Sequence, residues 1–334
     1  MVWQVGAKPD RDRRSPLWAV TCFFNPAGYR RRIRNYHWFR SCLSLPLVTV
    51  ELSFSGEFAL TPEDAEVLVQ LDQGDIMFQK ERLLNIGLER LPAGCEAVVW
   101  IDCDVVFGLP DWPARLLEAL EDYQMVQPFS ERYDLPPDVG PNGIASHTKP
   151  ADRLSLMAKI ARDGLTASDF DTEQPPLGKP AWGLAWAARR EVLDRHGLYD
   201  ACIFTGGDVA IFCAAFGAME GRFMRRRMNP ASHRHYLKWA GPFYRTVGGS
   251  VGFLEGPLYH FWHGAIAARR YRACLEELQA FGFDPSTDLA LTAQKTWRWA
   301  SHKPDLQAHV RDYFFRRDED AGVQVPSPAS EVTR

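Results

Sequence analysis

The sequence contains 334 residues, of which 46% are hydrophobic and 12% are aromatic. This composition supports a substantial packed core in one large α/β domain or two smaller ones, and it excludes wholesale disorder. The formal net charge of -3 gives no general reason to expect a polyanionic partner.

Cysteine usage and hydropathy indicate the compartment. Seven cysteines are scattered along the chain without a Cys-x-x-Cys pair, so the sequence suggests neither a disulfide framework nor a structural zinc site. Residues 1–14 lack the apolar core of a signal peptide, and no stretch approaches the roughly 18 apolar residues of a membrane span. We therefore expect a cytoplasmic protein without a membrane partner, whose oligomeric state the sequence does not indicate.

Residues 17–101 show strand and helix patterns in alternation. Apolar or β-branched runs predict strands at 17–24, 45–52 and 97–101, and the last of these (AVVWI) is apolar throughout, as in a strand buried on both faces. Helix patterns lie between them at 29–43 and 75–91, the second ending before Pro92 and Gly94. This alternation predicts βαβ units and an α/β fold with a mainly parallel sheet flanked by helices.

The second half of the chain is less regular. The proline-rich stretch 130–180 has one helix pattern, at 152–162, and predicts a long excursion over the face that binds substrates. A strand is expected at 182–188, and helices at 190–196, after residue 207 and at 265–281. The polar segment 318–334 contains two prolines and predicts a flexible tail.

Asp102 and Asp104 directly follow the strand expected at 97–101. Ligands of open α/β sheets bind at the carboxyl ends of the strands, and these two side chains point to the same side. Paired carboxylates there suit a Mg2+ or Mn2+ ion that bridges a diphosphate and neutralises charge on the leaving group. We therefore predict both residues as metal ligands, although Asp-x-Asp is also a common turn at the end of a strand.

The sequence His-Phe-Trp-His-Gly at 260–264 is a second candidate. An imidazole can complete a metal site begun by carboxylates, and the adjacent Gly264 lets the backbone approach a phosphate. We predict His263 as the third metal ligand. His260 is either a satisfied polar residue or a group that supports a ligand.

A third candidate is Thr205-Gly206-Gly207-Asp208. A flexible turn here delivers the Asp208 carboxylate to the start of a helix, where it can act on a bound substrate as a general base or as an orienting group. The alternative is an acidic residue that stabilises the helix N-terminus.

Basic residues gather in three places. Lys80 and Arg82, with Asn85 beside them, can reach a nucleotide, although a surface helix with ordinary charge pairing explains them as well. The group Arg30, Arg31, Arg32 and Arg34 predicts either binding of diphosphate or nucleic acid or an exposed basic helix face. Residues 221–254 contain seven Lys and Arg and no acidic residue, interleaved with aromatic residues, which favours an anion-binding surface over a solvated face.

These motifs, in this order, resemble the GT-A glycosyltransferases, in particular the branch of family two and the polypeptide N-acetylgalactosaminyltransferases. The resemblance covers about residues 17–320. Asp102 and Asp104 match the Asp-x-Asp element, the stretch 183–189 matches a strand that leads to a Gly-Gly-Glu element, here Gly206-Gly207-Asp208, and His263 matches a late metal-binding histidine. The segments QKERLLN, WIDCDVVF and HFWHG are also similar to uncharacterised glycosyltransferase-like proteins of bacteria and tailed phages.

The resemblance implies a domain organisation and a set of ligand contacts. We expect a tail at 1–15, a GT-A domain at 16–265 with a nucleotide-binding half (16–130) and an acceptor half (131–265), a helical extension at 266–317 and a flexible tail at 318–334. The residues implied to bind the nucleotide sugar are Thr21, Phe23, Asn25, Pro26, Lys80, Arg82, Asn85, Asp102, Gly206, Gly207 and Arg269.

The implied activity is a glycosyltransferase that uses Mn2+ or Mg2+ to move a hexosyl or N-acetylhexosaminyl group from a UDP- or GDP-sugar to a hydroxyl of a glycan or small molecule. Asp208 is the implied catalytic residue, and because relatives carry Glu there, inverting and retaining outcomes both stay open. A phage-type variant would glycosylate a hydroxymethylated base of DNA, with the basic stretch contacting the duplex. Alternatives from other classes are a non-catalytic nucleotide-sugar-binding protein and a metal-dependent phosphohydrolase or nuclease.

Overall fold

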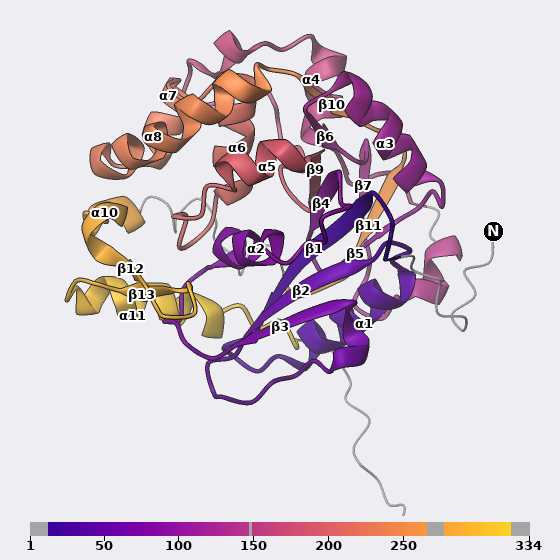
Figure 1. Ribbon diagram of the computed structural model, residues 1–334. Coiled ribbons are helices and arrows are strands. Elements are labelled where there is room, and N and C mark those ends of the chain that lie inside the picture. The colour runs from indigo at the N-terminus through magenta and orange to yellow at the C-terminus, as the bar shows by residue number, and fades with distance from the viewer. Residues whose placement is uncertain (1–12, 147–148, 266–276, 322–334) are drawn as a thin grey trace, which may run out of the picture.

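The computed structural model describes residues 13–146, 149–265 and 277–321 (Figure 1). Its main sheet has seven strands in the order β10-β6-β9-β4-β1-β2-β3. Every neighbouring pair is parallel except the two that involve β9, which runs antiparallel to β4 and β6. The strands are β1 (Leu17–Phe24), β2 (Leu47–Leu52), β3 (Val67–Leu71), β4 (Ala97–Ile101), β6 (Met125–Gln127), β9 (Ala185–Arg189) and β10 (Val251–Phe253).

Helices cover both faces of this sheet, because its central strands are apolar on both sides. Val20 and Trp100 point to the face that is covered by α2 (Lys80–Leu88), α6 (Gly207–Phe216) and α8 (Pro230–Val247). Ala19 and Val99, one position along each strand, point to the face covered by α1 (Arg30–Cys42) and α3 (Trp112–Asp122). The remaining helices before residue 265 are α4 (Leu156–Asp163), α5 (Arg190–His196) and α7 (Arg222–Arg227). The predicted α/β fold, a mainly parallel sheet flanked by helices, is confirmed.

A second, four-stranded sheet has the order β5-β11-β7-β8. Its strands are β5 (Val105–Phe107), β7 (Glu131–Asp134), β8 (Arg153–Leu154) and β11 (Pro257–His260). β11 is antiparallel to β5 and parallel to β7. Because β5 follows β4 in the chain but belongs to the second sheet, the short segment between them links the two sheets. Short 3-10 helices occupy Pro62–Asp64, Pro141–Ser146 and Ala167–Phe170.

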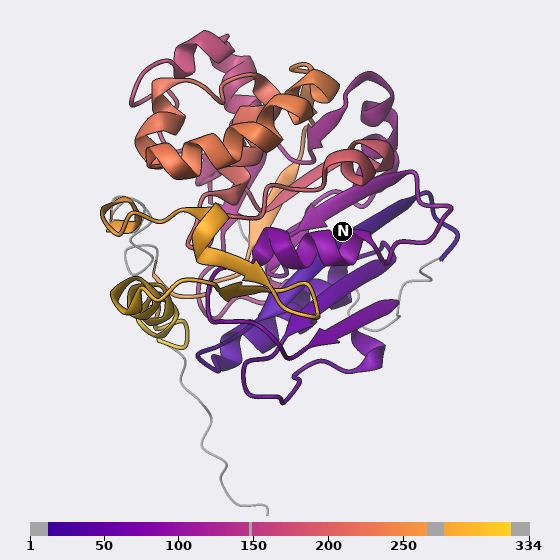
Figure 2. The ribbon, with the colours of Figure 1, turned by 60° about the vertical axis from the view of Figure 1, so that its left-hand side comes forward.

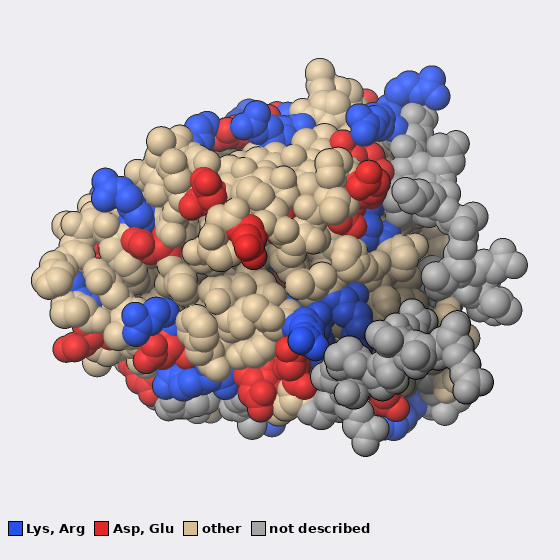
Figure 3. Space-filling model, turned by 90° about the horizontal axis from the view of Figure 1, so that it is seen from below, with Lys and Arg blue, Asp and Glu red and all other residues tan. Residues whose placement is uncertain are grey.

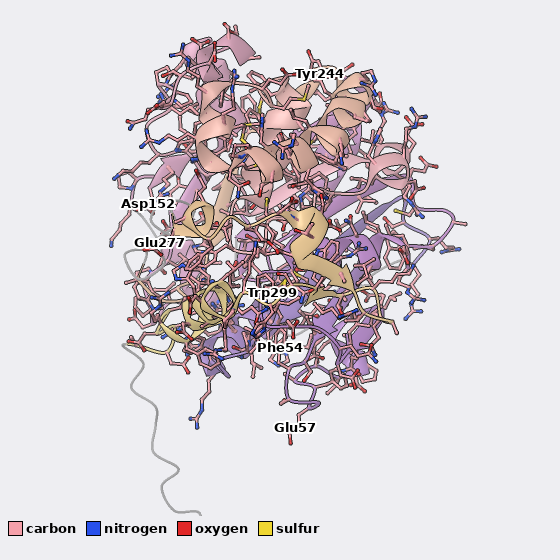
Figure 4. The ribbon with its side chains drawn as sticks, turned by 90° about the vertical axis from the view of Figure 1, so that its left-hand side faces the viewer. Phe54, Glu57, Asp152, Tyr244, Glu277 and Trp299 are labelled. Atoms are coloured by element: carbon pink, nitrogen blue, oxygen red, sulfur yellow. The ribbon has the colours of Figure 1, made fainter. Side chains whose placement is uncertain are left out.

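The C-terminal part consists of α10 (Pro285–Asp288), the hairpin of β12 (Leu289–Leu291) and β13 (Trp297–Trp299), and α11 (Pro304–Phe315). Figure 2 shows the hairpin in front of α2. In the side view of Figure 4, the segment that carries Trp299 lies between α8, which carries Tyr244, and the loop after β2, which carries Phe54. The C-terminal elements thus pack on the sheet domain rather than extend away from it.

Several element bounds differ from the sequence prediction for physical reasons. The helix expected at 75–91 begins only at Lys80, because Asp75 and Gln79 bind the backbone of β13. The stretch 130–180, expected as an irregular excursion with one helix at 152–162, contains the strands β7 and β8 besides α4, which lies where that helix was predicted. Glu319, expected near the start of a flexible tail, is fully buried. The helix expected at 265–281 lies mostly outside the described residues.

None of the described helices combines the length and apolar character that a membrane crossing requires.

The contact of α2 with β1 leaves no room for a side chain at Gly87. A Cβ atom there would lie 2.6 Å from Cγ1 of Val20, which is fully buried and cannot move aside. We expect Gly87→Ala to destabilise the protein, because overpacking costs about 1–3 kcal/mol and the helix-propensity gain is at most about 1 kcal/mol. A lower urea midpoint would show this. Gly94→Ala is the matched control, since a Cβ atom there meets nothing within 4 Å, and equal midpoints for the two variants would contradict the prediction.

Candidate functional site

A cleft with a volume of about 360 Å³ lies at the carboxyl ends of β1 and β4. The chain runs outward from β1 through β2 to β3 and then returns to β4 on the other side of β1. Such a reversal leaves a crevice at the strand ends, where ligands of open α/β sheets bind. The cleft therefore occupies the position that the topology favours for a ligand.

Lys80, Asp102 and Asp208 form a partly buried ion-pair group on one side of this cleft. Lys80 Nζ lies 2.6 Å from Asp102 Oδ1 and 3.1 Å from Asp208 Oδ2, although the three residues come from the start of α2, the end of β4 and the first turn of α6. Burial alone would lower the pKa of Lys80, but Asp102 and Asp208 outweigh it and raise this pKa well above the usual value. Lys80 is therefore an ammonium ion that holds two carboxylates together.

Asp104, His260 and His263 form a second group in the same cleft. β11 lies between β5 and β7, in a register that places His260 opposite Val105 and Asp134. The Phe261 N–H donates to the Asp104 carbonyl at 2.8 Å, which extends the pairing of β11 to the residue before β5. Strand pairing thus brings a residue that follows β4 next to two histidines more than 150 positions later.

The ligand atoms of these three residues converge. Nε2 of His260 and Nε2 of His263 are 2.9 Å apart, and Asp104 Oδ2 lies 3.9 Å and 3.3 Å from them respectively. One ligand atom from each residue falls within a 4.8 Å span. All three side chains are less than one fifth exposed, at 19% or below.

A carboxylate paired with arginine lies behind each histidine. His260 Nδ1 is 2.9 Å from Asp134 Oδ1, and Asp134 is paired with Arg132 at 2.5 Å. His263 Nδ1 is 3.8 Å from Oε1 of Glu319, a residue that follows α11. Glu319 is in turn paired with Arg32 and Arg317, each at 2.7 Å. In metal sites, carboxylates in this position fix the orientation of the ligand imidazole and raise its basicity.

The pKa directions agree with these pairings. Burial would raise the pKa of Glu319, but the charge of Arg32, the nearby His263 and the charge of Arg317 lower it well below the usual value. Burial is likewise outweighed at Asp134, whose pKa is lowered by the hydrogen bond from His260 and the charge of Arg132. Both carboxylates are therefore ionised, and each is fixed beside a histidine.

This donor set fits a divalent cation. One carboxylate oxygen and two imidazole nitrogens converge, and Nδ1 of His260 lies 2.9 Å from the ionised carboxylate of Asp134, which leaves its Nε2 for an ion. Imidazole nitrogen is a common ligand of transition metals, whereas Mg2+ prefers oxygen ligands. Asp104, His260 and His263 are thus the residues that could hold a metal in this cleft.

The structure brings most of the predicted site residues to the cleft. Its lining includes Thr21, Phe23, Lys80, Asp102, Asp104, Gly206, Gly207, Asp208 and His263. The assignment of Asp102 as a metal ligand stays a prediction, because its contact in this structure is Lys80. The start of α6 reaches the cleft through Gly206, whose φ of 97° is one that glycine adopts readily.

Other predicted residues lie elsewhere. Asn25 binds the backbone of Tyr29, and neither Asn25 nor Pro26 is among the residues that line the cleft. Arg82 and Asn85 both bind Asp200, outside the cleft. Arg269 lies outside the described residues. Of the arginine cluster in α1, Arg32 lines the cleft, whereas the buried Arg31 donates to the Pro137 carbonyl and Arg34 stacks on Trp38.

Sequence reasoning missed residues that reach the cleft through long-range pairing. Asp134 and Arg132 meet His260 only because β7 pairs with β11, and no local motif marks them. Glu319 lies in the polar segment 318–334, whose composition predicts a flexible tail rather than part of a site. Glu81 lies beside Lys80 in an ordinary pattern of helix charges. His260 itself gave the one accessible signal, because a histidine buried between strands needs a polar partner. The sequence does not indicate which residue that partner is.

Comparisons with known proteins were made for the sequence and for the structure. No protein-family model matches the chain, and no curated protein matches it. Among solved structures, TarS 1-349 of S. aureus aligns over 94% of this chain and 75% of its own, with 11% identity and a TM-score of 0.38.

Two further solved structures also align over most of this chain with low sequence identity. The mannosyltransferase PcManGT of Pyrobaculum calidifontis, in complex with GDP-Man and Mn2+, aligns over 96% of this chain and 91% of its own, with 14% identity and a TM-score of 0.34. The 4-diphosphocytidyl-2C-methyl-D-erythritolsynthase of Anaerococcus prevotii covers 72% of this chain and 86% of its own, with 10% identity and a TM-score of 0.33. Similarities of this size assign neither a family nor an activity.

If the three-residue group holds an ion, His260 is a ligand and not a supporting residue. We expect His260→Ala to weaken binding of Mn2+ by more than about ten-fold, the effect that even supporting groups produce, as measured by isothermal titration calorimetry. The exposed His302 is the matched control, and His302→Ala should bind as the wild type does. Unchanged affinity in His260→Ala would show that the ion, if it binds, is held by other residues.

Proposed function

We propose that this protein is a divalent-metal-dependent glycosyltransferase that moves a sugar from a UDP- or GDP-sugar to an acceptor hydroxyl. The observation that carries the proposal is the meeting of two groups in one cleft at the strand ends. Asp104, His260 and His263 form a candidate metal site, and Asp102, Lys80 and Asp208 lie in the same cleft. A cation beside a second, carboxylate-bearing group is what transfer from a diphosphate leaving group requires.

The metal side of the cleft suits the diphosphate. A bound Mn2+ or Mg2+ would stabilise negative charge on the leaving nucleoside diphosphate. Arg153 and Arg227 also line this cleft, and guanidinium groups bind phosphate oxygens in pairs. The order of the motifs, which resembles the GT-A glycosyltransferases, supports the same orientation of the donor.

Asp208 is the proposed general base for the acceptor hydroxyl. It is delivered to the cleft by the first turn of α6, and its carboxylate packs against the Cα of Gly183, where a Cβ atom would collide with it. Burial raises the pKa of Asp208, while Lys80 lowers it. A base held by a lysine is oriented before the acceptor arrives, which is the geometric requirement for proton removal.

The other functions are less well supported by the described residues. A nuclease or phosphohydrolase with two metals needs additional carboxylates near the first ion, but Asp134 and Glu319 are already paired with arginines. For a DNA acceptor, the basic stretch 221–254 is partly neutralised, since Arg226 pairs with Glu173 and Arg222 lies 4.0 Å from Asp171. Figure 3 shows the opposite side of the molecule from α7 and α8, and there acidic and basic residues are interspersed.

The test is incubation of the protein with Mn2+ and a panel of nucleotide sugars. We expect one UDP- or GDP-sugar to raise the melting temperature only when Mn2+ is present, and slow release of free nucleoside diphosphate from it. Binding without release would favour the non-catalytic binding protein. If no nucleotide sugar binds with or without Mn2+, the proposed function is wrong.

The role of Asp208 has its own test. We expect Asp208→Asn to lower kcat for transfer by about 100-fold or more, the usual contribution of a general base, while the affinity for the nucleotide sugar changes little. Asp194→Asn on the surface of α5 is the matched control, because Asp194 is 54% exposed and pairs only with Arg190 among the described residues. Full activity in Asp208→Asn would exclude it as the base.

A further inference from the structure

Glu81 is a buried carboxylate for which the fold supplies no partner. It is 2% exposed and lies in the first turn of α2, among the residues that line the cleft. Neither of its carboxylate oxygens accepts a hydrogen bond from another described residue. A buried carboxylate in this state is costly, so it calls for an explanation other than stability.

The backbone at the start of α6 is shaped around this side chain. The Glu81 carboxylate packs so closely against Gly207 that a Cβ atom at residue 207 would collide with both of its oxygens. Gly207 directly precedes Asp208, and both Glu81 and Asp208 are among the residues that line the cleft. The glycine gives Glu81 access to the same region of the cleft as the proposed base.

Lys80 does not neutralise Glu81 directly. Its ammonium group forms ion pairs with Asp102 and Asp208, and these two carboxylates already exceed its single charge. Glu81 is thus a third carboxylate beside one ammonium ion. Burial raises the pKa of Glu81 to about 8, with Lys80 lowering it and Asp208 raising it further. A neutral carboxyl group carries one hydrogen-bond donor and one acceptor, and a sugar hydroxyl offers the matching pair.

We propose that Glu81 binds a hydroxyl group of the sugar carried by the nucleotide-sugar donor, through its unpartnered carboxyl group beside Gly207. The proposal rests on the proposed function and adds a residue that recognises the sugar rather than the nucleotide. Glu81 is a binding residue in this scheme, because Asp208 takes the proton. The ligand supplies the hydrogen bonds that the fold leaves out, which explains why an unpaired carboxyl group persists in a packed region.

The experiment compares Glu81→Gln and Glu81→Met with the wild type in the presence of Mn2+. Gln keeps one donor and one acceptor at nearly the same place, whereas Met keeps the size and loses both. Affinities are measured for a nucleotide sugar and for the corresponding nucleoside diphosphate alone, and melting temperatures are recorded without ligand. The matched control is Glu89→Met, since Glu89 follows α2 on the exposed surface and pairs with Lys295.

We expect the nucleoside diphosphate to bind all variants alike. The nucleotide sugar should bind Glu81→Met about ten-fold more weakly or worse, as for a lost buried hydrogen bond, and Glu81→Gln within a few-fold of the wild type. Glu81→Met should also melt about 2 °C higher or more, because an unpartnered buried polar group has been removed. Glu89→Met should show neither effect.

Each other result contradicts the proposal in a different way. If Glu81→Met binds the nucleotide sugar as tightly as the wild type, Glu81 does not recognise the sugar and the proposed function is untouched. Equal loss of affinity for the nucleoside diphosphate, or a lower melting temperature in Glu81→Met, would show that the carboxyl group supports the fold. Absence of nucleotide-sugar binding by the wild type overturns the proposed function itself, and the proposal for Glu81 with it.

Discussion

The position of β11 between β5 and β7 is the constraint on which the candidate metal site depends. This pairing places His260 beside Asp104 on one side and Asp134 on the other, although the three residues are far apart in the sequence. His263 follows three residues later and adds the third ligand atom. Because backbone hydrogen bonds of a sheet fix register, the position of His260 relative to its neighbours is fixed by the sheet. Such rigidity suits a site that must hold an ion in one geometry.

The charge balance of the cleft follows from this arrangement. On the metal side, the carboxylates behind the histidines are neutralised by Arg32, Arg132 and Arg317. On the other side, Lys80 holds Asp102 and Asp208. The carboxylates on the metal side are compensated by their arginines, so the charge of an arriving diphosphate and its cation does not disturb these pairs, whereas the single charge of Lys80 offsets only one of the two carboxylates beside it. Preorganisation of this kind lowers the reorganisation that binding and reaction require.

The sequence predicted the features that depend on local patterns. The sheet, its flanking helices and the place of Asp102, Asp104 and Asp208 at strand and helix ends follow from hydrophobic period and turn residues. The partners of these residues did not follow, because Asp134 and Glu319 reach the histidines only through strand pairing and the return of the C-terminal segment. The predicted start of α2 was wrong because it also depends on a long-range contact. Asp75 and Gln79, which precede the helix, accept hydrogen bonds from the backbone of β13.

The buried carboxylates of this one cleft separate into two kinds, and the difference indicates their roles. Glu319 is fully buried but paired with two arginines, and removal of one partner from such a pair typically costs about 3–5 kcal/mol. Glu81 is buried as deeply and has no such partner among the described residues. A paired carboxylate stabilises the fold around the histidines, whereas an unpaired one can regain its hydrogen bonds only from a ligand. Although the two residues are equally buried, their pairing therefore assigns Glu319 to the structural support of the site and Glu81 to its ligand-binding surface.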